Sequence, residues 1–335
     1  MAAWHGYAIP SRRRPLTPLL LPRNPVPRQA LLRRIRTALL APGLLLALSG
    51  PARAAAPHHD RVVVVVMENK SYDEVRSLPY ISSLLAQGAT LSNSVAIRHP
   101  SQPNYFALWG GNTLGITNDN CPAPGSPFST QNLGQMCETH SLTWRAYSEN
   151  LGAVGSTLCS FDGNVFTGLY TRKHDPWTYY SNVNHTNERP YTDLAVDIAA
   201  GTLPNLVFIV PNNCHNTHNT STPGCGLADG DAWLAANMPA VIAALGPTGL
   251  LVLTWDEDDS SMSNQVLTAF VGPLVLPGVV STQVLNHYTI VRMICEALGF
   301  PTFERATAEA SIVNVWKSVT PTLKKNWGRL KLIYR

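Results

Sequence analysis

A run of six apolar residues, VVVVVM, lies between Arg61 and Glu68 and restricts the possible folds more than any other segment. Five consecutive valines favour an extended chain, because their side chains are branched at Cβ. Nothing in the run alternates between apolar and polar residues, so both faces of such a strand must be covered. The run therefore predicts a central strand of a parallel sheet in an α/β fold.

Other segments repeat this pattern and extend the prediction to the whole domain. We expect further strands at residues 143–147, 205–210, 250–255 and 267–271, and helices at 80–87, 104–109, 133–140, 231–245 and 287–298. Such alternation is typical of βαβ units, in which helices cover both faces of the sheet. Residues 118–130 and 214–230 are rich in Asn, Pro, Gly, Ser and Thr and are expected to be loops. We expect one large α/β domain over residues 57–316.

The positive charge of the chain is concentrated in its first segment. Nine of the 25 Lys and Arg residues lie within residues 1–56, where Asp and Glu are absent. A basic stretch, the apolar run at 38–48 and small residues at 52–56 follow the order of an export signal. The apolar run is too short to span a bilayer comfortably, so we expect a cleaved leader. The mature protein is then secreted or periplasmic, without a transmembrane anchor; a misassigned start codon is the alternative explanation of the long basic region.

The rest of the chain is acidic. It carries 16 basic against 21 acidic residues, which excludes a simple nucleic-acid-binding body. Hydrophobic residues make up 45% of the chain and charged residues only 14%, so disorder is excluded as well. Residues 317–335 hold six Lys and Arg and no acid, and we interpret them as a basic, solvated tail.

Six cysteines agree with export. They are Cys121, Cys137, Cys159, Cys214, Cys225 and Cys295, and no two of them have the CxxC spacing of a structural zinc site. Disulfides are therefore favoured. Six cysteines allow 15 pairings. We expect Cys214 with Cys225 first and Cys121 with Cys159 second, and leave the last two cysteines unassigned.

Carboxylates follow two of the predicted strands. The first strand ends in Glu68 and Asn69, and the strand at 250–255 is followed by four consecutive acids at 256–259. Carboxyl ends of parallel strands meet at one edge of the sheet, where ligands bind. Oxygen ligands from these residues suit a hard divalent cation, which would also relieve the repulsion between the acids. The alternatives are a helix cap after Glu68 and a solvated acidic turn at 256–259.

A serine and several histidines form the second group of candidate residues. Ser101 precedes Pro103, and proline suits the first turn of a helix, so Ser101 is expected at a helix N-terminus. Free amides there favour a phosphate or an alkoxide, although a simple capping serine is the common case. His99, His218 and His287 lie near predicted strand ends, and three such histidines indicate a functional site.

Six segments in this order resemble one family. They are MENKSY (67–72), HPSQPNY (99–105), AVGSTLC (153–159), RKHDPW (172–177), GDAWL (230–234) and TWDEDD (254–259). Together they resemble the bacterial phosphoesterase family of acid phosphatases and phosphatidylcholine-type phospholipases C, within the alkaline-phosphatase superfamily. The similarity is closest to secreted acid phosphatases of the mycobacterial phosphatidylinositol 3-phosphate phosphatase type. It implies a three-layer α/β/α sandwich with a mostly parallel sheet.

The resemblance also implies roles for individual residues. Ser101 is the expected nucleophile, and His99, His218 and His287 are expected around the phosphate. Glu68, Asn69, Asp256 and Glu257 are expected metal ligands, and Asn104 and Asp231 are expected to bind substrate. Two exchanges stay open, because His215 could replace His218 and Asp258 could replace Glu257.

The implied activity is that of a phosphoric monoester hydrolase, a metal-dependent acid phosphatase with a phosphoserine intermediate. The substrate is a small-molecule or lipid phosphate monoester, and no nucleic-acid partner is expected. Oxygen ligands suggest Mg, Ca or Mn, whereas added histidines shift the choice toward Zn or Fe. The alternatives are a phospholipase C-type phosphodiesterase and a non-catalytic surface protein that binds metal or phosphate. An acidic body does not attract anions, so the metal, the helix terminus and the histidines must supply positive potential locally.

Overall fold

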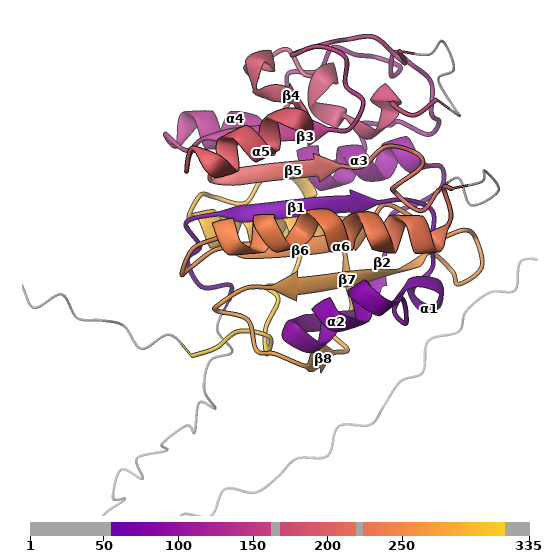
Figure 1. Cartoon of the computed structure of the whole chain (residues 1–335). Helices are drawn as coiled ribbons and strands as arrows, with labels where there is room; N and C mark the ends of the chain where they lie inside the picture. Colours follow the sequence, from indigo (N-terminus) through magenta and orange to yellow (C-terminus); the bar gives the residue numbers. More distant parts are fainter. Residues whose placement is uncertain (1–54, 162–167, 219–223, 319–335) are drawn as a thin grey trace, which may run out of the picture. The chain divides into compact units, whose positions relative to one another are not determined.

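A mixed sheet forms the centre of the computed structural model, which describes residues 55–161, 168–218 and 224–318 (Figure 1). Within these residues the sheet has nine strands in the order β4-β3-β5-β1-β6-β7-β2-β8, with β9 paired to β2. The strands are β1 (Val62–Met67), β2 (Ala89–Val95), β3 (Trp144–Ser148), β4 (Glu188–Pro190), β5 (Leu206–Val210), β6 (Leu250–Trp255), β7 (Gln265–Val271), β8 (Val279–Ser281) and β9 (Leu285–Asn286).

The valine run is the central strand that the sequence predicts. All six residues of β1 are buried, and β1 pairs in parallel with β5 on one side and β6 on the other. Met67 lies opposite Trp255, so the residues that follow both strands emerge side by side at one edge of the sheet. This register places Glu68 next to Asp256.

One long strand departs from the parallel arrangement. β7 runs antiparallel to both β6 and β2, and its arrow in Figure 1 points opposite to that of β1. Only residues 256–264 connect β6 to β7, which is too short for a parallel crossover. The acidic segment is therefore the turn of a hairpin. β2 was not expected, because its sequence ATLSNSV mixes polar and apolar residues without a clear period.

Helices cover both faces of the sheet. α3 (Ser101–Gly110), α4 (Leu133–Thr139) and α7 (His287–Leu298) pack on the face that contains Val62 and Val64. α1 (Tyr72–Val75), α2 (Pro79–Gln87), α5 (Thr192–Ala199) and α6 (Leu227–Ala244) pack on the face that contains Val63 and Val65. The remaining helical turns are η1 (Arg172–His174), η2 (Pro176–Tyr179), η3 (His185–Asn187) and η4 (Glu304–Ala308). The three-layer α/β/α sandwich is confirmed.

The predicted helix at residues 231–245 begins earlier than expected. α6 starts at Leu227, because the Asp229 carboxylate accepts a hydrogen bond from Gly226 N at 2.7 Å and so caps the helix. The loop predicted at 214–230 therefore ends at residue 226. The other four predicted helices and all five predicted strands are present, with bounds that differ by up to three residues.

Both expected disulfides are present. Cys121 is bonded to Cys159 and Cys214 to Cys225, while Cys137 and Cys295 are buried free thiols. No helix in the described part of the chain has the length and apolar character needed to cross a membrane. The leader at 1–56 and the tail at 317–335 fall almost entirely outside the described residues, so both stay predictions.

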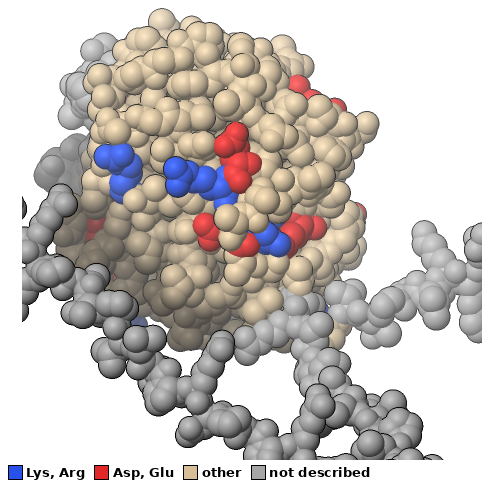
Figure 2. Space-filling view, turned by 180° about the vertical axis from the view of Figure 1, so that it is seen from behind, with Lys and Arg blue, Asp and Glu red and all other residues tan. Residues whose placement is uncertain are grey.

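Charged side chains of both signs are mixed on one face of the molecule. On the side shown in Figure 2, Lys and Arg side chains lie beside Asp and Glu side chains and are separated by wide uncharged areas. Charges of opposite sign at such spacing cancel within about one Debye length, roughly 8–10 Å. This face therefore presents no extended positive potential to a polyanion.

Candidate active site

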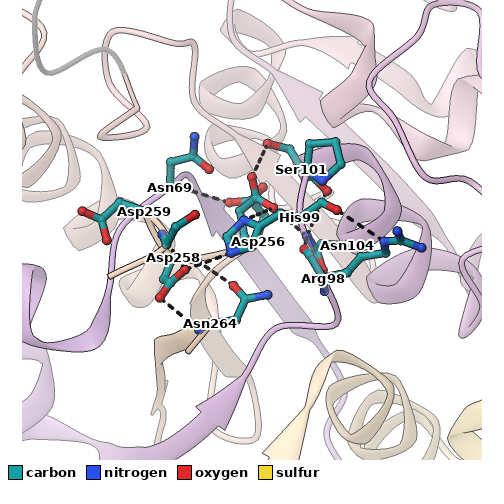
Figure 3. A network of polar contacts seen from close by, with 12 residues as sticks. Asn69, Arg98, His99, Ser101, Asn104, Asp256, Asp258, Asp259 and Asn264 are labelled. Atoms are coloured by element: carbon teal, nitrogen blue, oxygen red, sulfur yellow. Dashed lines mark hydrogen bonds and ion pairs between the residues drawn. The ribbon is translucent and has the colours of Figure 1, made fainter. Parts of the chain in front are cut away.

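Ser101 is the first residue of α3, at the helix N-terminus that Pro103 in the first turn predicts. Its side chain is buried, and its Oγ lies 3.2 Å from Glu68 Oε2 and 3.2 Å from Glu257 Oε1. Figure 3 shows Ser101 pointing toward the carboxylates at the ends of the central strands. The hydroxyl therefore lies between two acids and at the positive end of a helix.

Glu68 is the centre of the polar network. It is fully buried, and two histidines contact it: His174 Nε2 lies 3.0 Å from Oε1 and His218 Nδ1 lies 2.9 Å from Oε2. Burial raises the pKa of Glu68, but the charge and hydrogen bonds of the two histidines outweigh burial and hold the pKa well below its usual range. Glu68 is therefore ionised.

The pKa values of Asp256 and Glu257 shift in the opposite direction, upward. Burial, followed by the charge of Glu68, raises the pKa of Asp256 well above its usual range and that of Glu257 to about 9. Adjacent buried carboxylates oppose one another's ionisation unless a cation neutralises them. Three acids at one sheet edge thus favour a positively charged ligand.

Two buried oxygen atoms without hydrogen-bond partners indicate that a cation fits between the strand ends. Asn69 Oδ1 and Asp256 Oδ2 are buried and accept no hydrogen bond, whereas Asp256 Oδ1 accepts one from Asn69 N at 3.1 Å. Across residues 55–161, 168–218 and 224–318, no group of three or more His, Cys, Asp and Glu side chains forms a ready-made metal centre. The set that fits a hard cation is instead mixed, with carboxylates from Glu68 and Asp256 and the amide oxygen of Asn69.

Glu257 and Asp258 have their oxygens engaged by protein groups. Glu257 Oε2 lies 3.0 Å from His99 Nδ1 and accepts a hydrogen bond from Asn104 Nδ2 at 3.2 Å. The Asp258 carboxylate accepts from the amides of Ser260, Met262 and Asn264, and its Oδ1 contacts His99 Nε2 at 3.1 Å. Asp258 therefore shapes the hairpin turn, whereas Glu257 contacts Ser101.

The predicted histidines have different environments. His99 is held between Glu257 and Asp258 at the mouth of the site (Figure 3), and His218 reaches Glu68 and also Asn69 Nδ2 at 3.3 Å. His215 pairs instead with Glu149 at 2.9 Å, so His218 is the histidine of this loop that reaches the site.

His287 lies behind the site. It is fully buried, and its Nε2 donates to the backbone oxygen of Asp256 at 2.6 Å, which fixes the end of β6. Burial lowers the pKa of His287 to about 4, so its imidazole is neutral. Its position supports Asp256, and no contact places it against the pocket.

The pocket itself has a volume of about 290 Å³ and opens beside these groups. It is lined by Asn69, Lys70, His99, His218, Glu257, Asp258, Asp259 and Ser260. This space suits a phosphate group and part of the group that it esterifies, because small-molecule sites are typically about 300–1,000 Å³.

Asn104 positions the segment before Ser101. Its Oδ1 accepts from Ile97 N and Arg98 N, and its Nδ2 donates to Arg98 O at 2.6 Å and to Glu257. These bonds hold the turn that carries His99. Asn104 therefore lies at the site, although its contacts are with the protein.

The contacts of Asp231 at the start of α2 support a structural role, and its predicted substrate-binding role stays a prediction. Its two carboxylate oxygens accept hydrogen bonds from Tyr80 N and Ile81 N, both at 2.9 Å, at the start of α2. The first amides of a helix have no partner within the helix, so an adjacent buried carboxylate satisfies them. The GDAWL segment gave no signal that distinguishes this cap from a ligand.

We therefore expect Asp231→Ala to lower the free energy of unfolding by about 1–3 kcal/mol, because two buried amides lose their acceptors. The kcat/KM for a phosphate monoester should stay within about twofold of wild type. Urea denaturation and steady-state assays measure the two effects, and Asp231→Asn, which keeps one acceptor oxygen, is the matched control. A loss of kcat/KM with unchanged stability would restore the substrate-binding assignment.

Further residues near Glu68 were not assigned a role from the sequence. His174 contacts Glu68 and stacks on Tyr105 with ring centroids 4.9 Å apart, and Lys173 forms a buried ion pair with Asp119 at 2.8 Å. The RKHDPW segment contributes to the family resemblance, but its residues lie in a short 3-10 turn without periodicity. Only the tertiary contacts reveal what these side chains do.

Comparison with known proteins agrees with this geometry. The model of the phosphoesterase family matches residues 74–301. The chain belongs to the phosphoesterase family. A phosphatidylinositol-3-phosphatase of Mycobacterium tuberculosis is 38% identical over 271 residues, which cover 80% of this chain and 86% of that protein. An acid phosphatase of Aspergillus fumigatus is 28% identical over 266 residues, which cover 76% of this chain and 58% of that longer protein.

The fold of this phosphoesterase also has solved counterparts. A protein in the alkaline phosphatase superfamily from Vibrio parahaemolyticus superposes with a TM-score of 0.54 over 74% of this chain and 69% of that chain, at 10% identity. This likeness concerns the fold alone. The family model and the relatives confirm the predicted family and the prediction of a phosphoric monoester hydrolase.

Proposed function

We propose that this phosphoesterase is a secreted, divalent-cation-dependent acid phosphatase that hydrolyses phosphate monoesters through a phosphoserine at Ser101. The position of the Ser101 hydroxyl carries the proposal, because Oγ lies 3.2 Å from both Glu68 and Glu257 at the N-terminus of α3. A serine hydroxyl is a weak nucleophile until a neighbouring base or positive charge favours its alkoxide.

Glu68, Asp256 and Asn69 would hold the cation, and Glu257 would stand beside it. Their oxygen atoms suit Mg, Ca or Mn, while the nearby His218 extends the choice to Zn. When bound, a divalent cation lowers the pKa of the serine hydroxyl and offsets the repulsion between phosphate and carboxylates. The unpartnered oxygens of Asn69 and Asp256 support this assignment.

Ser101 and His218 carry out the remaining steps of the proposed phosphoryl transfer. Ser101 Oγ forms a bond to phosphorus while the bond from phosphorus to the ester oxygen breaks, in line with the attack. His218 lines the pocket and contacts Glu68, so it is placed to protonate the leaving alcohol. Water then attacks the phosphoserine, and the phosphate leaves with Ser101 restored.

The substrate class follows from the same geometry and from the relatives. A pocket of about 290 Å³ between Asn69, His99 and His218 admits a phosphate group and leaves one side for an ester group. Relatives named acid phosphatases and a phosphatidylinositol-3-phosphatase support a phosphate monoester, either small or lipid-borne. Two disulfides and the leader pattern support secretion.

Assay of the full chain on p-nitrophenyl phosphate tests the proposal. We expect phosphate release that is lost on dialysis against a chelator and restored by one of the named cations. The rate should be higher at about pH 5 than at about pH 8, as imidazolium groups stabilise bound phosphate. Release of phosphocholine from phosphatidylcholine, without monoester turnover, would support a phosphodiesterase instead.

A further inference from the structure

Lys173 has a buried ammonium group beside the site. Its side chain is 5% exposed, and Nζ lies 2.8 Å from Asp119 Oδ2. Lysine is rarely buried to this extent unless it is paired or functional. The next residue, His174, contacts Glu68, so η1 brings both a lysine and a histidine to the acidic centre.

Asp119 connects this ammonium to the helix of the nucleophile. Its second oxygen, Oδ1, accepts a hydrogen bond from Gln102 N at 2.9 Å, and Gln102 directly follows Ser101. A single carboxylate group therefore joins the Lys173 ammonium to the second amide of α3. Gln102 Nε2 also donates to Asn120 O at 3.3 Å, which holds the Asp119 loop against the same helix terminus.

The charge of Lys173 acts on the whole acidic cluster. Burial disfavours the charged form, but Glu68, Asp119 and Asp256 outweigh burial and raise the pKa of Lys173, so the ammonium stays charged. The same charge acts on Glu257 and Glu68 in return. The raised pKa keeps the Lys173 ammonium charged at neutral pH.

We propose that Lys173 is a further phosphate-site residue: its ammonium supplies a permanent positive charge for the phosphate dianion at Ser101, and the Asp119 carboxylate neutralises part of that charge. This inference rests on the proposed function. A dianion that approaches three carboxylates needs compensating positive charge close by. Lys173 supplies that charge from a position that Asp119 connects to the second amide of α3.

Substitutions of Asp119 and Lys173 are expected to change the affinity for phosphate in opposite directions. Because its carboxylate neutralises part of the Lys173 charge, Asp119→Asn should free that charge for the phosphate. The asparagine oxygen can still accept from Gln102 N, so α3 keeps its capping bond. Lys173→Met removes the charge itself. Phosphate should therefore bind more tightly to the first variant and more weakly to the second.

The experiment measures inhibition of p-nitrophenyl phosphate turnover by inorganic phosphate in the full chain. For Lys173→Met we expect the inhibition constant to rise by about 10- to 100-fold, which corresponds to loss of one charged hydrogen bond or ion pair. Lys173→Arg should recover most of this loss. Asp119→Asn should lower the constant by about threefold or more. Lys317→Met is the matched control, because Lys317 Nζ is exposed and donates to Pro273 O.

Unchanged phosphate inhibition in Lys173→Met, within about twofold of wild type, would overturn the inference. A rise in the constant for Asp119→Asn would also overturn it, because a purely structural ion pair loses function when either partner is removed. If Lys173→Met does not fold, the sign of the Asp119→Asn effect decides. Absence of turnover in the wild-type chain would reject the proposed function itself, which separates the two failures.

Discussion

Ser101→Ala is expected to reduce kcat for p-nitrophenyl phosphate by about 10³-fold or more, because the phosphoryl group loses its acceptor oxygen. The fold should be retained, since the hydroxyl's partners are the site carboxylates Glu68 and Glu257. Removing the hydroxyl also frees both acids for the cation, so metal content should not fall. Acid-quenched turnover followed by mass spectrometry should find one phosphoryl group on the wild-type peptide that contains Ser101.

Ser94→Ala is the matched control for this variant. Ser94 is equally buried, but its Oγ lies 2.8 Å from Thr268 Oγ1 within the sheet. We expect near wild-type kcat and a loss of about 1 kcal/mol in the free energy of unfolding. Turnover of Ser101→Ala at the level of Ser94→Ala, or a phosphoryl group trapped on another side chain, would reject Ser101 as the nucleophile.

Glu68→Gln is expected to remove both the cation response and at least about 10²-fold of the activity. Glu68 contacts Ser101, His174 and His218 at once, so one substitution changes all three contacts. In the metal-free protein the change relieves the repulsion with Asp256 but removes the ionised partner of His174 and His218, so thermal stability without metal should fall. The melting temperature of wild type should rise on adding the divalent cation, and that of Glu68→Gln should not.

Glu188→Gln is the control, because Glu188 is a buried glutamate that also contacts a histidine. Its Oε1 lies 2.7 Å from His185 Nδ1 on the edge strand β4. This variant should keep the cation-dependent rise in melting temperature and most of the activity, although it loses stability. An unchanged rise in Glu68→Gln would show that Glu68 does not hold the cation.

Local sequence signals were sufficient to place Ser101 at a helix N-terminus and polar residues at the ends of two neighbouring strands. Pro103 fixes the first turn of α3 and so places Ser101 at the helix N-terminus. The apolar runs before Glu68 and Asp256 predict two buried strands, and parallel pairing of adjacent strands brings their ends together. Each of these inferences depends on residues within a few positions of the site.

Roles that depend on contacts between distant segments could not be assigned in this way. Asp231 caps α2 from a position 150 residues further along the chain, and His174 reaches Glu68 across 106 positions from a 3-10 turn. His287 opens a helix as expected, yet it supports the backbone of Asp256 from behind. Histidine and aspartate suit ligands, caps and supports equally well, so residue type alone does not separate these roles.

The sequence alone determined the main strands and helices in their order along the chain, the helix terminus that carries Ser101, the two disulfides and the family. These features depend on local periodicity, on turn chemistry and on motifs in a fixed order. Only the tertiary structure decided which polar groups contact the same carboxylate. Contacts such as that of Lys173 with Asp119 depend on how distant loops pack at the edge of the sheet. A hydrogen bond depends on position to within a few tenths of an ångström, and the one-dimensional pattern does not contain that information.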